Sequence, residues 1–407
     1  MIAGDGPAGA GLDLVGAGLD LVGGRVFDPG QGIDSEATIS VDGGLISAIA
    51  PARDAEAAAG SERQELDVTG MLVVPGLVDL HTHLYPGVSH YGVEPDLHCL
   101  GRGVTTAVDA GSAGAQTFPG LRRYVIERSS TQILAFLNIA VEGMISSLVG
   151  ELEDIRRASP EQAADRAREN PDLVVGIKVR LGYQMVGDDP QPALRLARKA
   201  ADELGLPLMV HVIDMRPGLA WLLPRLRQGD IVTHCFHGNE GGILGAGERV
   251  LPEAVGARER GVVFDIGHGI GSFAYRVARN AIAQGFAPDT ISSDLHAHNA
   301  DGPVFDQATT LSKLLHAGME VDEVIKATTS TPATAIGKAA SLGAIGTGRE
   351  ADLSVLELRT GHWELPDAAG ETEVVERLLV PRAVIRAGRV RAIEPPASGL
   401  QAAERGR

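Results

Sequence analysis

The stretch Val74-Pro-Gly-Leu-Val-Asp-Leu-His-Thr-His83 ends an apolar run with two histidines. The apolar residues before them are typical of a buried β-strand. Residues at positions i and i+2 of a strand project from the same face, so the side chains of His81 and His83 are expected to point to one place. Neutral imidazole is a common metal ligand. The pair alone does not decide between a metal site and ordinary polar residues at the end of a strand.

Downstream of this stretch, apolar segments alternate with amphipathic helical patterns. Near-continuous apolar strands that alternate with helices predict a parallel sheet with both faces covered. Eight such units favour an α/β fold of the closed (β/α)8 TIM barrel type. An open doubly wound sheet is less consistent, because no G-x-G-x-x-G motif follows an early strand. The expected strands are Leu77–His83, Thr105–Gly111, Ile133–Ala140, Val174–Leu181, Leu206–Val212, Asp230–Phe236, Val262–His268 and Thr290–His296.

Two of the expected helices have clear boundaries. The segment Pro160–Glu169 follows Ser159, a residue type that caps helix N-termini. The segment Ala193–Leu204 stops at Gly205, which suits the left-handed conformation that ends many helices.

Both ends of the chain are rich in short strands and glycine turns. Residues 19–50 contain the hairpin signal Asp42-Gly43, and residues 346–358 and 380–393 have the same style. We predict one small β-sandwich built from both termini, and the second copy of a repeated GLDLVG, at Gly18–Gly23, as its first strand. The predicted division is 12–74 and 340–395 for the sandwich, 75–339 for the barrel, and 1–11 and 396–407 for flexible tails.

Charge and composition exclude several classes of partner. The net charge is −17, so a basic face for nucleic acid is not expected. Two cysteines are too few for a disulfide framework and suit a reducing compartment. No basic residue precedes Arg25, and Asp13 and Asp20 interrupt the early apolar stretches, so we expect neither a secretory signal nor a membrane span. We expect a cytoplasmic homo-oligomer that acts on a small molecule, without nucleic-acid or membrane partners.

Polar residues also occur at the ends of later strands, where their apolar surroundings do not explain them. Each one alone has an ordinary interpretation, such as a buried histidine bonded to the backbone or a lysine that reaches solvent. Six such groups at the same ends of five strands, counting the H-x-H pair, would cost several kcal/mol each if buried without mutual compensation. They therefore predict one shared site. The later members are Lys178, His211, His234 and Asp294.

These segments resemble the amidohydrolase superfamily, and more closely its deacetylase- or dihydroorotase-like branch. The family pattern is H-x-H on strand one, Lys on strand four, His on strands five and six, and Asp on strand eight. The resemblance covers nearly the whole chain after about Leu19. The matching segments are VVPGLVDLHTH (73–83), GIKVRLG (176–182), THCFHGNEGG (233–242), FDIGHGIGSF (264–273), ISSDLHAHNADGPVFD (291–306) and GAIGTGREADLSVLEL (343–358).

The resemblance implies a binuclear centre with two divalent metal ions. We expect Zn²⁺, although Mn²⁺ and Fe²⁺ also suit mixed histidine and carboxylate ligands. A free lysine ammonium would be repelled by metals, whereas a lysine carboxylated on its N6 atom is an anionic oxygen donor. The implied nucleophile is a bridging hydroxide, with Asp294 as the catalytic proton shuttle. The implied ligands are His81, His83 and Asp294 for one metal, His211 and His234 for the other, and carboxylated Lys178 between them.

The branch also implies a substrate class. The expected reaction is hydrolysis of an amide or ester, removing the acyl group of an N-acyl amino acid or acylated 2-hydroxy acid. Such a substrate bears a carboxylate, and Arg180 and Tyr183 after strand four are candidates to anchor it, because arginine binds carboxylates in a bidentate manner. His268 is expected to touch substrate, and His296 lies at the expected barrel mouth.

Three alternatives stay open. A cyclic amide hydrolase of the dihydroorotase or dihydropyrimidinase kind would use the same metals. A mononuclear nucleobase deaminase keeps the histidines and the aspartate but has no bridging lysine, so Lys178 counts against it. A catalytically silent scaffold on the same barrel is disfavoured, because every ligand of the pattern is present.

Overall fold

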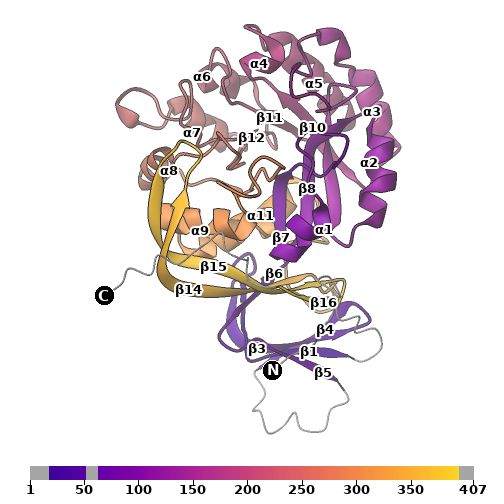
Figure 1. The fold of residues 1–407 in the computed structure, drawn as a ribbon, viewed down its shortest axis with the longest axis vertical. Coiled ribbons are helices and arrows are strands. Elements are labelled where there is room, and N and C mark those ends of the chain that lie inside the picture. Colours follow the sequence, from indigo (N-terminus) through magenta and orange to yellow (C-terminus); the bar gives the residue numbers. More distant parts are fainter. Residues whose placement is uncertain (1–17, 52–62, 394–407) are drawn as a thin grey trace.

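Seven parallel strands form a sheet that curls around itself in the computed structural model, which describes residues 18–51 and 63–393. The strands pair in chain order, and helices cover the outer face (Figure 1). The predicted (β/α)8 fold class is confirmed. The strands are β7 (Leu77–Thr82), β8 (Val104–Gly114), β9 (Gln132–Asn138), β10 (Val174–Arg180), β11 (Leu208–His211), β12 (Ile231–Thr233) and β13 (Val263–Asp265).

The eighth predicted strand, Thr290–His296, is not a regular strand. It lies between the two edges of the sheet and joins them through isolated bridges, Thr290 with Asp265 and Leu295 with Thr82. Side chains take over part of the hydrogen bonding that a strand would make with its neighbours, since the Ser293 hydroxyl accepts from the Leu295 N–H. Asp294 has a φ of 49°, which lies outside the β region. The segment closes the barrel while departing from strand geometry at the site.

The helices follow the predicted signals. The Ser159 hydroxyl accepts from the Gln162 N–H at the start of α3, and Gly205 ends α5 with a φ of 65°. The α-helices are α1 (Pro95–His98), α2 (Phe118–Tyr124), α3 (Pro160–Arg168), α4 (Tyr183–Val186), α5 (Gln191–Leu204), α6 (Leu219–Leu222), α7 (Pro252–Glu259), α8 (Tyr275–Ala283), α9 (Gln307–Ala317), α10 (Val321–Ala327) and α11 (Ser330–Ala335). Short 3₁₀ turns lie at Leu100–Arg102, Ile126–Arg128, Ile155–Arg157, Leu223–Arg225 and Ala246–Glu248.

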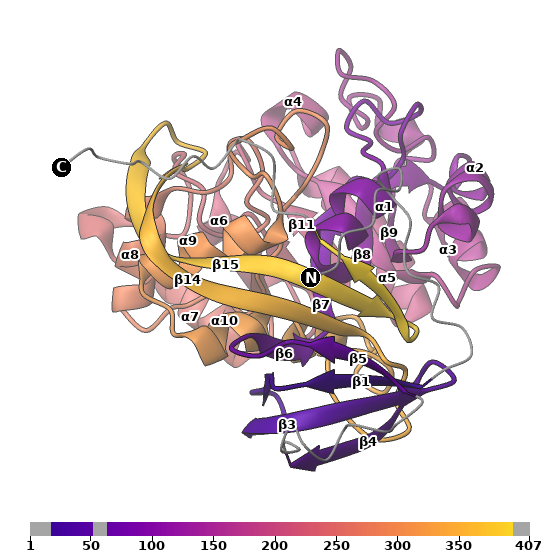
Figure 2. The same cartoon turned by 60° about the horizontal axis from the view of Figure 1, so that its bottom comes forward.

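The terminal segments meet in a second β structure beneath the barrel (Figure 2). Strand β6 pairs with β14 in antiparallel register, Val74 opposite Ser354, which joins the N-terminal part to the C-terminal part as predicted. The predicted hairpin connects β3 to β4 through Gly43 and Gly44, both at positive φ. The strands are β1 (Leu19–Val22), β2 (Arg25–Asp28), β3 (Ile33–Asp42), β4 (Leu45–Pro51), β5 (Gln64–Asp67), β6 (Leu72–Pro75), β14 (Leu353–Pro366), β15 (Thr372–Arg386) and β16 (Arg389–Ala392).

This structure has its own apolar core, which includes Leu21 and Ile39 from the N-terminal strands with Val355 and Ile385 from the C-terminal ones. The second GLDLVG copy supplies β1, as predicted. The first copy and both predicted tails lie outside the described residues. Across the ranges that the structure describes, no helix has the length and apolar character needed to cross a membrane.

A separate apolar cluster fills the barrel interior. It includes Leu80, Val108, Leu134 and Phe136, with Met209 from β11. Because side chains pack the interior, the barrel has no pore, and the polar groups at the C-terminal strand ends lie above this apolar cluster.

Candidate metal centre

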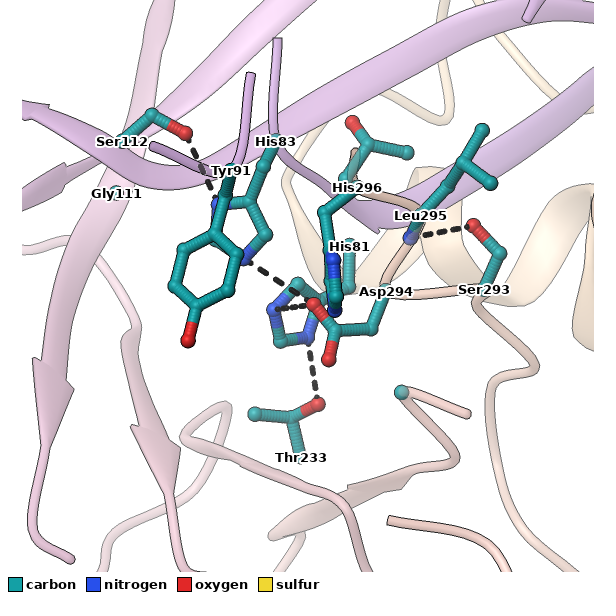
Figure 3. Close-up of polar contacts among 12 residues, drawn as sticks. His81, His83, Tyr91, Gly111, Ser112, Thr233, Ser293, Asp294, Leu295 and His296 are labelled. Atoms are coloured by element: carbon teal, nitrogen blue, oxygen red, sulfur yellow. Dashed lines mark hydrogen bonds and ion pairs between the residues drawn. The ribbon is translucent and has the colours of Figure 1, made fainter. Parts of the chain in front are cut away.

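One aspartate and two histidine side chains meet at the C-terminal ends of the strands (Figure 3). His81 is the penultimate residue of β7, and His83 directly follows the strand. The Asp294 Oδ1 atom lies 3.2 Å from His81 Nε2 and 3.1 Å from His83 Nε2. The Asp294 N–H also donates to the His81 carbonyl, which fixes the approach of the eighth segment to β7. Alternation along β7 thus brings both imidazoles to one carboxylate, as the H-x-H spacing predicts.

His234 joins this group from the neighbouring side of the barrel. Strand β12 stops at Thr233, and His234 has a φ of 73°. Its Nδ1 donates to the Gly267 carbonyl at 2.7 Å, which leaves Nε2 as the unprotonated nitrogen. That Nε2 atom is buried and has no hydrogen-bond partner among the described residues. A buried acceptor without a partner is costly, and a metal ion would satisfy it.

One ligand atom each from His81, His234 and Asp294 lies within 4.8 Å of the others. His211, at the end of β11, stands edge-on to His234 with ring centres 4.4 Å apart. Burial lowers the pKa of His81 and His211 well below the ordinary value, and it lowers the pKa of His83 and His234 to about 3. All four imidazoles are therefore neutral near pH 7, the form that binds metals. The residues present fit a divalent metal centre.

Lys178 lies at the base of the same group. It is fully buried on β10, and its Nζ atom is 3.2 Å from His81 Nε2 and 3.4 Å from Met209 Sδ. Burial lowers the pKa of Lys178 to about 7. Gly111 faces this side chain, and a Cβ atom there would lie 2.8 Å from Lys178 Cγ. The glycine leaves the room in which the lysine reaches the histidines.

A buried hydroxyl and a buried carboxylate, neither of them predicted, orient His81. The Thr233 hydroxyl lies 2.8 Å from His81 Nδ1 and donates to Asp265 Oδ2 at 2.8 Å. Asp265 also accepts hydrogen bonds from the hydroxyls of Thr290 and Ser292. Burial raises the pKa of Asp265 to about 6. The sequence signal that could have identified Asp265 is an aspartate directly at the end of an apolar strand, as in VVFDIG.

All the ligand candidates except His234 line a cavity of about 240 Å³. Apolar side chains, including Met144, Met185, Ile213 and Ile270, form part of its wall. Two of the predicted substrate contacts, Arg180 and His296, also line it, together with Tyr91.

Arg180 forms a buried bidentate ion pair in the cavity wall. Its Nε and Nη2 atoms donate to the two carboxylate oxygens of Glu151 at 2.6 and 2.7 Å. Burial opposes the charge of Arg180, but Glu151 outweighs this effect and holds the pKa of Arg180 above its ordinary value. Arg180 is thus buried in the cavity wall and paired with Glu151, and it does not lie at a hydrated rim.

The structure places the other two predicted substrate contacts outside the cavity. His268 is fully buried, stacks on Phe273 and lies 2.9 Å from the Lys313 ammonium through its Nε2 atom. The glycines on either side of His268 have positive φ, and the loop turns its side chain away from the ligands. Tyr183 is 41% exposed at the start of α4 and lines a neighbouring groove, where Arg216 lies over its ring.

A (β/α)8 barrel whose strand ends gather neutral histidines, a lysine and an aspartate around one cavity defines a metal-dependent hydrolase of the barrel class. Comparisons with known proteins agree. Residues 274–391 match the model of the amidohydrolase family. The chain is 37% identical to a deacetylase of Agrobacterium fabrum over 356 residues, covering 87% of this chain and 86% of that protein. A deacetylase of Brucella anthropi is 38% identical over 340 residues, 83% of each chain. This chain belongs to the amidohydrolase family.

Solved structures give the same result at the level of the fold. A crystal structure of an adenine deaminase has a TM-score of 0.85 and 31% identity, covering 92% of this chain and 99% of its own. A crystal structure of a dihydroorotase has a TM-score of 0.84 and 34% identity, covering 93% and 98%. These relatives carry three different names for their reactions, so the family establishes a metal-dependent hydrolase and leaves the substrate to be argued separately.

Proposed function

We propose that this protein is a binuclear hydrolase that removes the acyl group of an N-acyl amino acid or an acylated 2-hydroxy acid. The observation that carries the proposal is the buried Nε2 atom of His234, which has no hydrogen-bond partner among the described residues and lies beside His81 and Asp294. The deacetylase names of the relatives that match most of the chain support the acyl substrate.

Six side chains would hold the metals. When bound, two divalent ions activate a water molecule and polarise the scissile carbonyl group. Zinc suits the mixture of imidazole and carboxylate ligands, and N6-carboxylation would turn Lys178 into the anionic oxygen donor that a shared ligand must be. In this proposal the first ion is held by His81, His83 and Asp294, the second by His211 and His234, and both by carboxylated Lys178.

Asp294 is the group proposed to move the proton. Its Oδ1 atom lies 3.2 Å from His81 Nε2 and 3.1 Å from His83 Nε2, and only 8% of the residue is exposed. A carboxylate at this place can accept a proton from the attacking water and return it to the leaving nitrogen or oxygen. Removal of bulk water from the cavity strengthens the interactions of Asp294 with the attacking water and with the leaving group.

The carboxylate of the substrate has two candidate partners in the cavity wall. Glu151 accepts two of the five N–H bonds of Arg180, and Tyr91 also hydrogen-bonds the guanidinium. We propose that an N–H bond left over by these two partners binds the substrate carboxylate. His296 lines the same wall, with its ring centre 4.7 Å from that of Tyr91. The apolar residues opposite suit the uncharged remainder of the substrate.

The cyclic amide hydrolase is the second candidate, favoured by the similarity to a solved dihydroorotase. A mononuclear nucleobase deaminase is a weaker third candidate. The short distance between Lys178 and His81 argues for a lysine that takes part in the metal centre, which the deaminase class lacks.

One screen on the purified protein tests the proposal. Metal content should be close to two ions per chain, as a two-metal hydrolase requires. The protein should hydrolyse some N-acetyl amino acids of either hand, or acetylated hydroxy acids. Activity confined to dihydroorotate, hydantoins or cyclic imides would transfer the assignment to the second candidate, and ammonia released from nucleobases would transfer it to the third.

Two further proposals concern the location of the protein in the cell and its oligomeric state. Both cysteines, Cys99 and Cys235, are free and buried, which suits a protein of the cytoplasm. We also propose a homo-oligomer, which light scattering of the purified protein would test directly.

A further inference from the structure

Lys313 is a fully buried lysine on α9 that has no part in the metal centre described above. Its Nζ atom donates to the Pro303 and Pro366 carbonyls at 2.6 Å each and lies 2.9 Å from His268 Nε2. His268 Nδ1 donates to the Gly269 carbonyl, so Nε2 is the accepting nitrogen. Three acceptors thus use all three N–H bonds of an ammonium group. These bonds offset part of the cost of burial, which still lowers the pKa of Lys313 to about 7.

The three acceptors come from separate parts of the chain. His268 belongs to the loop after β13, Pro303 follows the closing segment of the barrel, and Pro366 ends β14 in the C-terminal sheet. The hairpin of β14 and β15 runs alongside α9 in both views (Figures 1 and 2). The Leu379 N–H of β15 donates to the Ser312 hydroxyl of α9.

The tip of this hairpin is fixed on the same loop. The Ala368 N–H donates to the Phe273 carbonyl, and the ring of Phe273 stacks on His268. The Asp367 carboxylate accepts from the Tyr275 N–H at the start of α8. The hairpin tip, the loop and Lys313 form one packed unit on the outer side of the site.

The inner side of the loop touches two candidate ligands. The Gly267 carbonyl accepts the hydrogen bond that orients His234. Gly269 lies so close to Asp294 that a Cβ atom would be 2.5 Å from its Oδ2 atom. A loop with hydrogen bonds on one side and ligand contacts on the other transmits a displacement of His268 to both ligands.

We propose that Lys313 is a positioning residue that couples the C-terminal hairpin to the metal centre through His268. The proposal rests on the ligand roles given under the proposed function. It assigns the β14–β15 hairpin a part in metal binding, in addition to its packing against the barrel. Outer partners of metal ligands change metal affinity when they are altered, by about 10- to 100-fold.

The test uses the full-length protein loaded with Co²⁺, whose visible absorption reports ligand geometry. Lys313→Met and His268→Leu are each expected to shift this spectrum and speed metal release to a chelator by about tenfold or more. His268→Gln retains an acceptor near the Nε2 position and is expected to stay within about threefold of the wild type. The control is Lys326→Met, at an exposed lysine of α10. This variant also removes a positive charge, and we expect its cobalt spectrum and metal release rate to match those of the wild type.

Circular dichroism separates loss of folding from loss of positioning. If Lys313→Met fails to fold, the His268→Leu and His268→Gln pair decides the question. Wild-type spectra and release rates in a folded Lys313→Met, or in a folded His268→Leu, would overturn the proposal. Equal damage in His268→Leu and His268→Gln would overturn it as well. Failure of the wild type to bind cobalt would instead count against the proposed function.

Discussion

The Thr233 hydroxyl lies 2.8 Å from His81 Nδ1, and its own proton points to Asp265. Because the hydroxyl accepts from Nδ1, the unprotonated nitrogen of His81 is Nε2, the atom nearest Asp294 and Lys178. A side chain on one strand thereby sets the tautomer of a histidine on another. Hydrogen bonds of this kind hold metal ligands in orientation and raise their basicity.

Thr233→Val tests this relay, because valine keeps the shape of threonine and removes the hydroxyl. We expect metal affinity to fall by about 10- to 100-fold, since His81 loses the acceptor that fixes its tautomer. Titration with a metal-sensitive chelator dye measures the change. Thr105→Val is the matched control, because that buried hydroxyl makes only a long bond of 3.4 Å to the Leu77 carbonyl. Equal affinities in the two variants would contradict the assigned role of Thr233.

Lys178→Ala tests the shared ligand. We expect metal content to fall from about two ions per chain and hydrolysis to be lost, because the only protein ligand proposed to reach both metals disappears. Elemental analysis and the rate on the best acyl substrate are the measurements. A short carboxylate such as propionate, added to fill the vacated space, should restore part of the activity. Full activity without it would show that Lys178 does not bridge.

Gly269→Ala tests the close approach of the loop to Asp294. The added Cβ atom would lie 2.5 Å from Asp294 Oδ2, at a φ of 53°. We expect kcat to fall by at least about tenfold, because even a small displacement of a catalytic carboxylate is costly. Gly271→Ala in the same loop is the control, since nothing lies within 4 Å of its Cβ position. Similar kinetics in both variants would contradict the prediction.

Glu151→Gln tests the buried ion pair with Arg180. Burial raises the pKa of Glu151, but the charge of Arg180 and its hydrogen bonds outweigh this, so the pKa lies below the ordinary value of 4.5. The folded state then favours the ionised form, and the pair stabilises the protein fully above about pH 4.5. At pH 7 we expect Glu151→Gln to lower the free energy of unfolding by about 3 kcal/mol or more, because Arg180 is left buried and unpaired.

The stability difference between wild type and Glu151→Gln should shrink as the pH falls below 4.5, because the unfolded wild-type chain then binds a proton at Glu151 that the folded state still excludes, and it is lost once the pH falls below the lower pKa of the folded state. Urea unfolding at pH 7, 5 and 3.5 measures it. Glu153→Gln removes an exposed charge from the same loop and should change stability by less than about 0.5 kcal/mol. A difference that stays constant with pH would show that the ion pair is not its source.

Local patterns in the sequence account for the positions of most elements. Alternation of apolar strands and amphipathic helices is a short-range property, so β10, α3 and α5 lie close to their predicted bounds. The fixed two-residue repeat of a strand likewise brings His81 and His83 to one carboxylate. The eighth segment departs from the prediction, because side chains take part of its hydrogen bonding and its Asp294 has a positive φ.

The sequence by itself determined the barrel, the sheet built from both termini and the order of the ligand candidates, because periodicity and strand order are written along the chain. Only the tertiary structure decided which polar groups face the cavity. It turned His268 outward onto Lys313 and paired Arg180 with Glu151. These partners lie 45 and 29 residues apart. Their contacts depend on how loops fold back over the strand ends, and a buried charge is paired by whichever opposite or polar group packing brings within reach.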